Sequence, residues 1–385
     1  MNSYSNMPSL DTEQAVRQRY SGAAQEREAA LCCPVDYDAR YLKAIPQEVI
    51  DRDYGCGDPS KHVRAGETVL DLGSGGGKIC FIASQVVGPE GRVIGVDMND
   101  EMLALARSSQ PKVAETIGYD NVSFRKGKIQ DLAVDRDAVE QFLSENPVTD
   151  DMSLRQLESF LAEMRSGQPM IPDESVDVVV SNCVLNLVDS GEKEFLFDEI
   201  FRVLRPGGRA VISDIVADCE VPEEMQADPE LWSGCISGAF ERAAFLEAFE
   251  QAGFVDINLD SLQTSPWQVV DGIGFRSATV VAYRPHLATE GEELLEQTTQ
   301  YLANQGTARR VYRGPFKYVV DDDGRMYTRG VACEDALAQA AERESIAEHF
   351  EIYDESSSGP AAQKPLVSSG LPTMGDDCCS GSGCC

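Results

Sequence analysis

The sequence has little histidine and no long apolar run. Its 385 residues include only three histidines, and its twelve cysteines contain no Cys-x-x-Cys pair, so the ligand spacing of a zinc ribbon is absent. No stretch approaches the ~20 apolar residues of a membrane-spanning helix. The N-terminal residues have neither a basic start nor an apolar core, so they do not predict a secretory signal. We therefore expect a cytoplasmic protein with no membrane association.

Basic residues are also few compared with acidic ones. The chain has 33 Lys and Arg against 65 Asp and Glu, a formal net charge of −32. The acids gather near 135–160, 289–296 and 321–323. Such a field repels phosphate backbones, which argues against nucleic acid as a partner. An anionic substrate gains no electrostatic attraction by approaching this protein. We therefore expect a neutral or cationic substrate, held by something other than charge.

The most informative segment is a glycine-rich turn after an apolar run. Thr68–Leu72 is followed by glycines that include Gly73 and Gly75, and then by an apolar stretch of helical character. Strand, tight turn and helix start are typical of a nucleotide or nucleoside site, because glycines let a ligand approach the backbone. Asp71 lies two residues before Gly73, so it favours a ligand with a positive amine over a pyrophosphate. S-adenosylmethionine has that amine and no phosphate.

Further alternating elements predict the fold class. A second buried strand ends in Asp97, an acid placed to bind a ribose hydroxyl pair. A helix from Asp100, with Asp100 as its cap or first-turn acid, and strands near 122–124, 176–182 and 209–213 follow. This order predicts an α/β protein with a doubly wound, mostly parallel sheet of the class I (Rossmann-like) type. The alternative to a cofactor-binding domain is an α/β domain in which the glycine turn is incidental.

The twelve cysteines are the second unusual feature of the sequence. In a reducing compartment they do not predict a disulfide framework. Cys183 follows the fourth strand, where ligands of open α/β sheets bind, while Cys56 and Cys235 each lie beside glycines. Three thiols on three segments could converge on one site, and thiolates select soft ions. A structural role is the alternative for Cys183, and Cys80 is expected to be a small buried apolar residue.

Four motifs together resemble the S-adenosylmethionine-dependent arsenite methyltransferases. They are Asp53-Tyr54-Gly55-Cys56-Gly57, the segment 71–77, Ser181-Asn182-Cys183-Val184-Leu185-Asn186-Leu187 and Trp232-Ser233-Gly234-Cys235-Ile236-Ser237-Gly238. The resemblance covers nearly the whole chain, including 311–350, and the family also contains paired terminal cysteines.

The resemblance implies a function and a set of site residues. Trivalent arsenic, supplied as arsenite or as a thiol conjugate, would bind Cys56, Cys183 and Cys235. Cys32 or Cys33 would relay disulfides, with glutathione or thioredoxin as the reductant. Methyl groups from S-adenosylmethionine would give mono- and dimethylated arsenicals. Apart from the resemblance, we expect the enzyme to be a monomer.

For the cofactor, each predicted contact has a separate role. Asp71, Gly73 and Gly75 are expected to hold the methionine end of the cofactor, and Asp97 its ribose. Met98 and Ile129 would lie against the adenine, with Gln130 near its edge, and Tyr54 would wall the methionine moiety. For Met98 and Ile129 plain core packing is the alternative. Cys56, the most loop-like thiol, is expected to arrive with the substrate.

We expect five segments along the chain. They are an N-terminal helical cap carrying the thiol loop (1–65), the cofactor domain with an acidic helical insertion near 135–172 (66–215), a thiol-bearing segment with a Cys235 helix and two closing strands (216–285), a small domain (286–353), and a disordered cysteine-rich tail (354–385). Two rival functions stay open. One is a quinone-type carbon methyltransferase, which needs no thiols, and the other is a thiol protein that sequesters metalloids without turnover.

Overall fold

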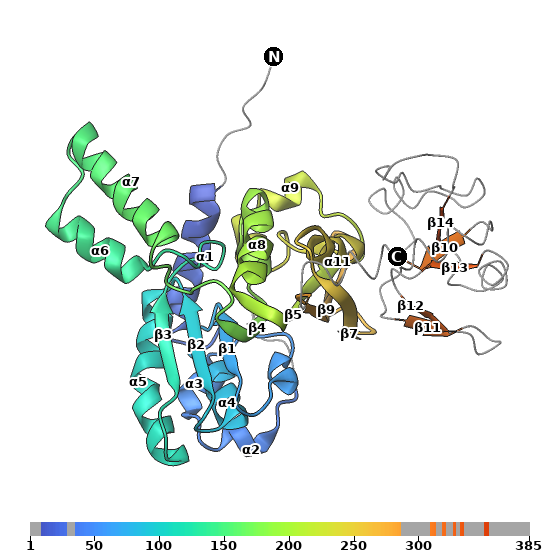
Figure 1. Ribbon diagram of the computed structural model, residues 1–385, viewed down its shortest axis with the longest axis horizontal. Coiled ribbons are helices and arrows are strands. Elements are labelled where there is room, and N and C mark those ends of the chain that lie inside the picture. The colour runs from blue at the N-terminus through green and yellow to red at the C-terminus, as the bar shows by residue number, and fades with distance from the viewer. Residues whose placement is uncertain are drawn as a thin grey trace.

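The computed structural model describes residues 9–28, 35–285 and five short strands between 309 and 353. Its centre is a twisted sheet in the order β3-β2-β1-β4-β5-β9-β7, in which β1 to β5 run parallel and β9 runs antiparallel to β5 (Figure 1). The strands are β1 Thr68–Leu72, β2 Arg92–Asp97, β3 Val122–Lys126, β4 Val176–Asn182, β5 Leu204–Ala217, β6 Phe240–Glu241, β7 Val255–Leu262, β8 Gln268–Val270 and β9 Ile273–Tyr283. This confirms the predicted class I, Rossmann-like α/β fold.

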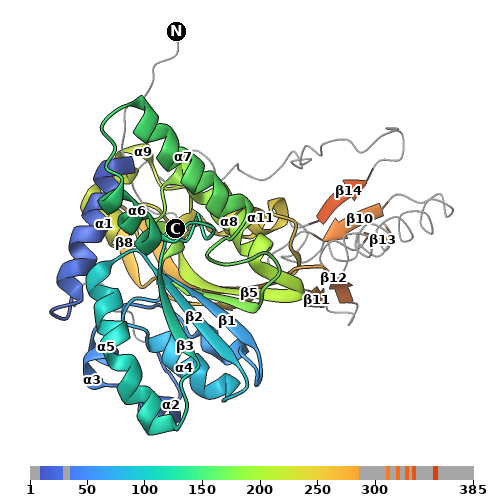
Figure 2. The same cartoon turned by 60° about the vertical axis from the view of Figure 1, so that its left-hand side comes forward.

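Helices cover both faces of the sheet and bury a separate apolar cluster on each (Figures 1 and 2). The α-helices are α1 Ser9–Ala23, α2 Ala39–Leu42, α3 Gln47–Asp51, α4 Lys78–Val87, α5 Asp100–Ile117, α6 Arg136–Glu145, α7 Asp151–Ser166, α8 Lys193–Val203, α9 Glu223–Gln226, α10 Pro229–Ser233 and α11 Arg242–Gln251. Side chains of α4 and α5 pack on one face, and those of α8 and α11 pack on the other. The central strands are buried on both sides, as expected for parallel strands between two helical layers.

Several element boundaries differ from the sequence prediction. Asn99, not Asp100, caps α5 by accepting the Met102 amide, and the helix runs through Pro111 to Ile117. Strand β5 begins at Leu204, before the Arg-Pro-Gly-Gly turn that was expected to precede it. Three closing strands occupy 255–283 rather than two, because β8 folds back as a hairpin on β9. The expected Cys235 helix is wrong, because α10 ends at Ser233 and Cys235 lies in the following turn with φ +61°.

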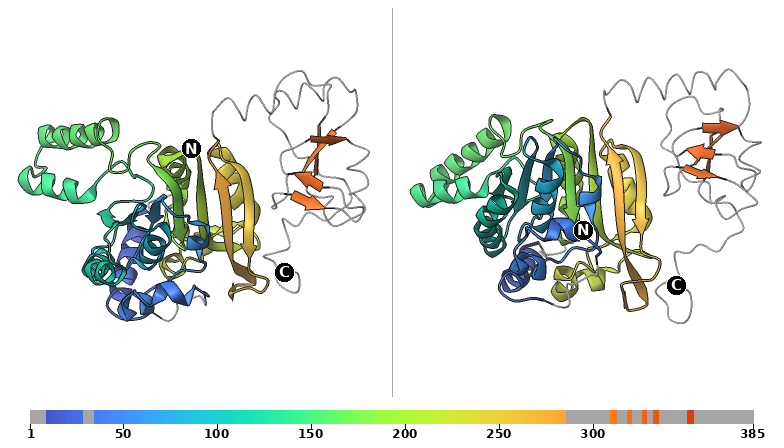
Figure 3. Two further views of the ribbon diagram at one scale, coloured as in Figure 1. Left: turned by 60° about the horizontal axis from the view of Figure 1, so that its bottom comes forward. Right: turned by 90° about the horizontal axis from the view of Figure 1, so that it is seen from below.

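The acidic insertion forms a helical arm that stands away from the sheet (Figures 1 and 3). It consists of α6 and α7, which meet through the stacked rings of Phe142 and Phe160, 4.4 Å apart. Within the described part of the chain α7 buries none of its residues. The arm therefore contributes little to the core that supports the cofactor side of the sheet.

The C-terminal region contains strands of two further sheets. One has the order β13-β10-β14 and the other pairs β11 with β12. These strands are β10 Arg309–Tyr312, β11 Tyr318–Val320, β12 Met326–Thr328, β13 Ala332–Glu334 and β14 Phe350–Tyr353. Cys32, Cys33 and the predicted tail 354–385 lie outside the described residues. Among the helices that are described, none is long and apolar enough to cross a membrane.

Candidate functional site

A cavity of about 300 Å³ opens at the carboxyl ends of β1, β2 and β4. This is the crevice where doubly wound sheets bind ligands, and the volume is at the lower end of the range for small-molecule sites. Of the predicted cofactor residues, all but one border it: Tyr54, Gly73, Gly75, Asp97, Met98, Ile129 and Gln130. The loops after β1, β2, β3 and β4 therefore bring together residues that are far apart in sequence.

The glycine turn and Asp97 form one rigid unit beside the cavity. Asp97 accepts the Gly75 amide at 2.8 Å and the Asn99 amide at 2.8 Å. Burial raises the pKa of Asp97, while these amides act in the opposite direction. Gly73 and Gly75 have φ +68° and +51°, a region that favours glycine. A Cβ at Gly73 would lie 2.4 Å from Val184, so a larger residue would push into the loop after β4.

The remaining predicted contacts have defined partners in the protein. Gln130 donates to Glu192 at 2.8 Å, and the Tyr54 hydroxyl donates to the Ala23 carbonyl at 2.9 Å. Ile129 is 6% exposed and belongs to the core cluster beneath α8, although it also borders the cavity. Packing and ligand contact are thus compatible at this position.

Asp71 differs from its expected position. It does not border the cavity, and its Oδ2 accepts a hydrogen bond from the buried Cys80 thiol at 3.2 Å. Burial raises the pKa of Asp71 to about 7, and the same cause raises the pKa of Cys80 well above its usual range. Cys80 is buried as predicted, but it acts as a hydrogen-bond donor as well as an apolar side chain.

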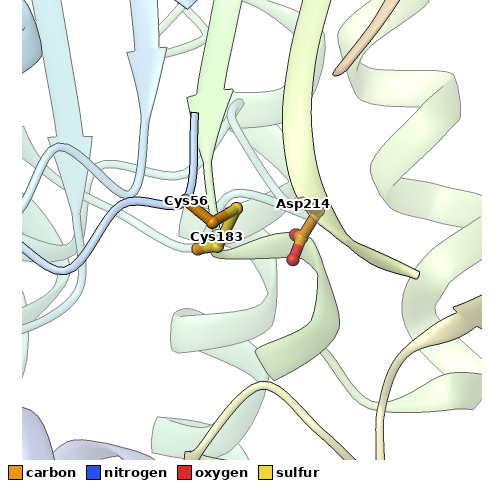
Figure 4. A group of neighbouring side chains, drawn as sticks. All are labelled: Cys56, Cys183 and Asp214. Carbon is orange, nitrogen blue, oxygen red and sulfur yellow. A yellow bond between two sulfur atoms is a disulfide. The ribbon is translucent and has the colours of Figure 1, made fainter. Parts of the chain in front are cut away.

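The three cysteines Cys56, Cys183 and Cys235 belong to one buried cluster. Cys56 and Cys183 are joined by a disulfide with their Cα atoms 5.9 Å apart, and the Cys235 thiol donates to the Cys183 carbonyl at 3.3 Å. A carboxylate oxygen of Asp214 and the two disulfide sulfurs all lie within 4.8 Å of one another (Figure 4). The structure thus gathers three thiol side chains but holds two of them oxidised.

The Cys56 loop is held by the side chain of Asn182. The Asn182 Oδ1 accepts the Cys56 and Gly57 amides at 2.8 and 3.0 Å, and its Nδ2 donates to the Gly57 carbonyl at 2.7 Å. A Cβ at Gly55 would lie 2.1 Å from this amide. Gly55 and Asn182 are therefore both needed for the close approach, and Cys56 is only 6% exposed.

Backbone strain and buried charge gather around the other two cysteines. Cys183 and Cys235 have φ +60° and +61°, an unfavourable conformation that concentrates at functional sites. Asp214 accepts the Leu185 and Ile215 amides at 2.8 and 2.7 Å. Burial raises the pKa of Asp214 to about 6 and lowers that of the nearby Lys193 to about 8, while attraction between the two opposes both shifts.

Comparison with known proteins fits this geometry. A methyltransferase domain model matches residues 64–166 and 159–253, and a domain of unknown function matches 302–368. An arsenite methyltransferase of Halobacterium salinarum is 34% identical over 71% of this chain and 67% of its own length. One from Aquipseudomonas alcaligenes is 34% identical over 66% of this chain and 65% of its own. The chain thus spans about two thirds of each relative.

A solved structure agrees with the sequence relatives. The crystal structure of an arsenic(III) S-adenosylmethionine methyltransferase from Chlamydomonas reinhardtii superposes with a TM-score of 0.51 at 25% identity, covering 83% of this chain and 96% of that one. This chain belongs to the arsenite methyltransferase family.

In this arsenite methyltransferase family member, several residues that border the cavity could not be identified from the sequence. Helix α1 borders the cavity through Val16, Arg17 and Tyr20, and the Tyr20 hydroxyl lies 3.8 Å from the Cys235 sulfur. Asp53 and Lys78 also border the cavity. Asn182 lay inside a motif that carried the resemblance, but its role in holding the Cys56 loop depends on a contact across 126 residues.

Proposed function

We propose that this protein transfers methyl groups from S-adenosylmethionine to trivalent arsenic held by Cys56, Cys183 and Cys235. The observation that carries the proposal is the position of Cys183, which borders the cofactor cavity and also belongs to the thiol cluster. An atom bound to this sulfur would face the cavity. The names of the relatives support the same substrate and methyl donor.

The residues of the cavity suit the cofactor. When bound, S-adenosylmethionine supplies an electrophilic methyl group on a sulfonium. The Asp97 carboxylate is fixed by two amides at the end of β2, so it can accept ribose hydroxyls without reorganising. The glycine turn leaves its backbone open to the ligand, and Met98, Ile129 and Gln130 border the part of the cavity assigned to the adenine.

The thiols would capture arsenic by exchange. Neutral arsenous acid loses one hydroxyl as water for each Cys S–H that replaces it, so three As–S bonds form and three waters leave. Arsenic keeps its lone pair, and the chain's contribution is to hold that atom beside the cavity; such positioning can lower a barrier by about 7–11 kcal/mol. No side chain needs to abstract a proton from the nucleophile.

Because Cys56 and Cys183 are joined by a disulfide, the proposed reaction needs a reductant before arsenic can bind. A Cys56–Cys183 disulfide cannot bind arsenic, because thiolates are the ligands. A dithiol, or two monothiols, would give two electrons and two protons and leave both side chains as thiols. We propose glutathione or thioredoxin for this role and Cys32 or Cys33 as the relay. The disulfide ties Cys56 to the end of β4, so reduction must precede any movement of this loop toward the substrate.

Three other predictions also stay proposals: that the enzyme works as a monomer, that it is cytoplasmic, and that the chain divides at the predicted segment boundaries. The match to a domain of unknown function at 302–368 supports a separate C-terminal unit, with an end beyond the predicted residue 353. The carbon-methylating and sequestering alternatives are not favoured. The first leaves three clustered cysteines without a use, and the second leaves the cofactor cavity without one.

The first test uses reduced full-length protein with S-adenosylmethionine and arsenite, and separates arsenic species by mass-detected chromatography. Wild type should form methylated arsenic, and Cys183→Ser should abolish this activity while it still binds S-adenosylhomocysteine. The control is Cys80→Ser, which replaces a buried thiol outside the cluster and should leave the activity unchanged. Near-normal turnover by Cys183→Ser would refute the three-thiol site, and arsenic uptake without product would support sequestration.

A further inference from the structure

The amino-acid end of the cofactor needs a binding partner other than Asp71. That carboxyl is 2% exposed, does not border the cavity and is engaged by the Cys80 thiol. Two charged side chains that do border the cavity are Asp53 and Lys78. We infer that Lys78 and Asp53 form the subsite for the α-carboxylate and α-ammonium groups of S-adenosylmethionine. This inference rests on the proposed function.

The two side chains form a fixed ion pair. The Lys78 Nζ lies 2.7 Å from the Asp53 Oδ2, and the side chains are 7% and 18% exposed. The ammonium group also lies over the Tyr37 ring, 3.6 Å from its centroid, and the Tyr37 hydroxyl donates to Asp53 at 3.4 Å. Because three contacts restrain the pair, it can receive a ligand without first ordering its two charged side chains.

The position of the pair fits the amino-acid end of the ligand. Lys78 is the first residue of α4, directly after the glycine turn, and Asp53 precedes Tyr54 on the opposite segment. Asp97, the predicted ribose acceptor, holds the same turn through Gly75. A ligand whose ribose lies at Asp97 would therefore extend along the turn toward the pair and the Cys183 side of the cavity, since all of these residues border it.

The chemistry of the pair is complementary to a zwitterion. An ammonium and a carboxylate side by side offer one partner to each charge of an α-amino acid, and lysine has three N–H donors of which Asp53 takes one. Among the described residues that border the cavity, five are acids and four are Lys or Arg. A cavity with a slight excess of acids suits a ligand that carries a sulfonium and an ammonium against one carboxylate.

The test measures binding by calorimetry, with three ligands and the reduced full-length chain. S-adenosylhomocysteine has both charged groups, 5′-deoxy-5′-(3-aminopropylthio)adenosine keeps the amine and lacks the carboxylate, and 5′-methylthioadenosine lacks both. Lys78→Met should weaken only the first ligand, by about ten- to a hundredfold, the effect of losing a hydrogen bond to a charged group. Asp53→Asn should weaken the first two ligands and spare the third.

Unchanged binding of 5′-methylthioadenosine shows that each variant is folded, and Lys78→Arg should recover most of the lost affinity. Lys112→Met, which removes an exposed lysine of α5, is the control for net charge. Equal weakening of all three ligands, or no weakening of S-adenosylhomocysteine by Lys78→Met, would overturn the inference and leave the proposed function standing. Failure of wild type to bind any of the three would instead refute the cofactor site itself.

Discussion

Asn182 shows how one side chain can connect two functional regions. It ends β4, immediately before Cys183, and its amide also holds the loop that carries Cys56. Two cysteines that lie 127 residues apart in sequence are thereby kept within disulfide distance. The residue types around the loop follow from this contact, because a side chain at Gly55 would overlap the Asn182 amide.

Asp71 leads to a prediction about pH and stability. Its pKa in the folded chain is raised by burial to about 7 from an ordinary 3.8, so the folded state favours the protonated carboxyl. The stability that it contributes is fully present below pH 4 and is lost as the pH rises through 7. Asp71→Asn cannot ionise, so at pH 8 it should be more stable than wild type, by on the order of 4 kcal/mol.

Thermal unfolding at several pH values between 5 and 8 measures this effect. The difference in Tm between Asp71→Asn and wild type should increase with pH, because wild type alone loses stability. The Asn side chain can still accept the Cys80 hydrogen bond, so this contact does not account for the change. A Tm difference that is the same at pH 5 and pH 8 would show that Asp71 does not titrate in this range.

At the scale of elements, local signals predicted the sheet well. Apolar runs, glycine turns and strand-end acids are encoded within a few residues, so β1, β2 and β4 and the cavity between them could be predicted from the sequence. Helix α1 as a wall of the cavity could not, because it has few apolar residues and its contacts are with α5 and α10, far along the chain. The Lys78–Asp53 pair was missed for the same reason, since it joins two segments whose charges look like ordinary surface residues.

The position of α1 predicts its response to the cofactor. It borders the cavity and is tied to its surroundings by a few polar contacts, including Lys128 with Glu13 at 2.5 Å and Arg19 with the Ser233 hydroxyl at 3.1 Å. A ligand that fills the cavity adds contacts to α1, so S-adenosylhomocysteine should slow amide hydrogen exchange in residues 13–23 by about tenfold or more.

Helices α6 and α7 serve as an internal reference in the same exchange experiment. They stand away from the sheet (Figures 1 and 3), and no residue of α7 borders the cavity. Their exchange should not change with ligand. Protection of the glycine turn without protection of α1 would mean that the helix does not close over the bound cofactor.

At the scale of the whole molecule, the charge and the thiol site have to be considered together. A protein with a formal charge of −32 attracts cations and repels anions over the range of the Debye length. S-adenosylmethionine is a net cation, and arsenous acid is neutral at pH 7. The field therefore favours the methyl donor and does not oppose arsenous acid, which the proposed thiol site would capture by bond exchange.

The net charge of the protein distinguishes arsenite from a thiol conjugate as the substrate. A tris-glutathione conjugate of arsenic carries several negative charges, so it must approach against the field, and its association rate should rise as salt screens the repulsion. For arsenous acid, the rate of uptake by the reduced protein should stay within about twofold between 20 and 300 mM salt. Stopped-flow measurement with each form, monitored by Trp fluorescence or thiolate absorbance, gives the dependence of each rate on salt concentration. A rate for the conjugate that falls with salt would show that a local cationic patch, and not the net charge, governs its approach.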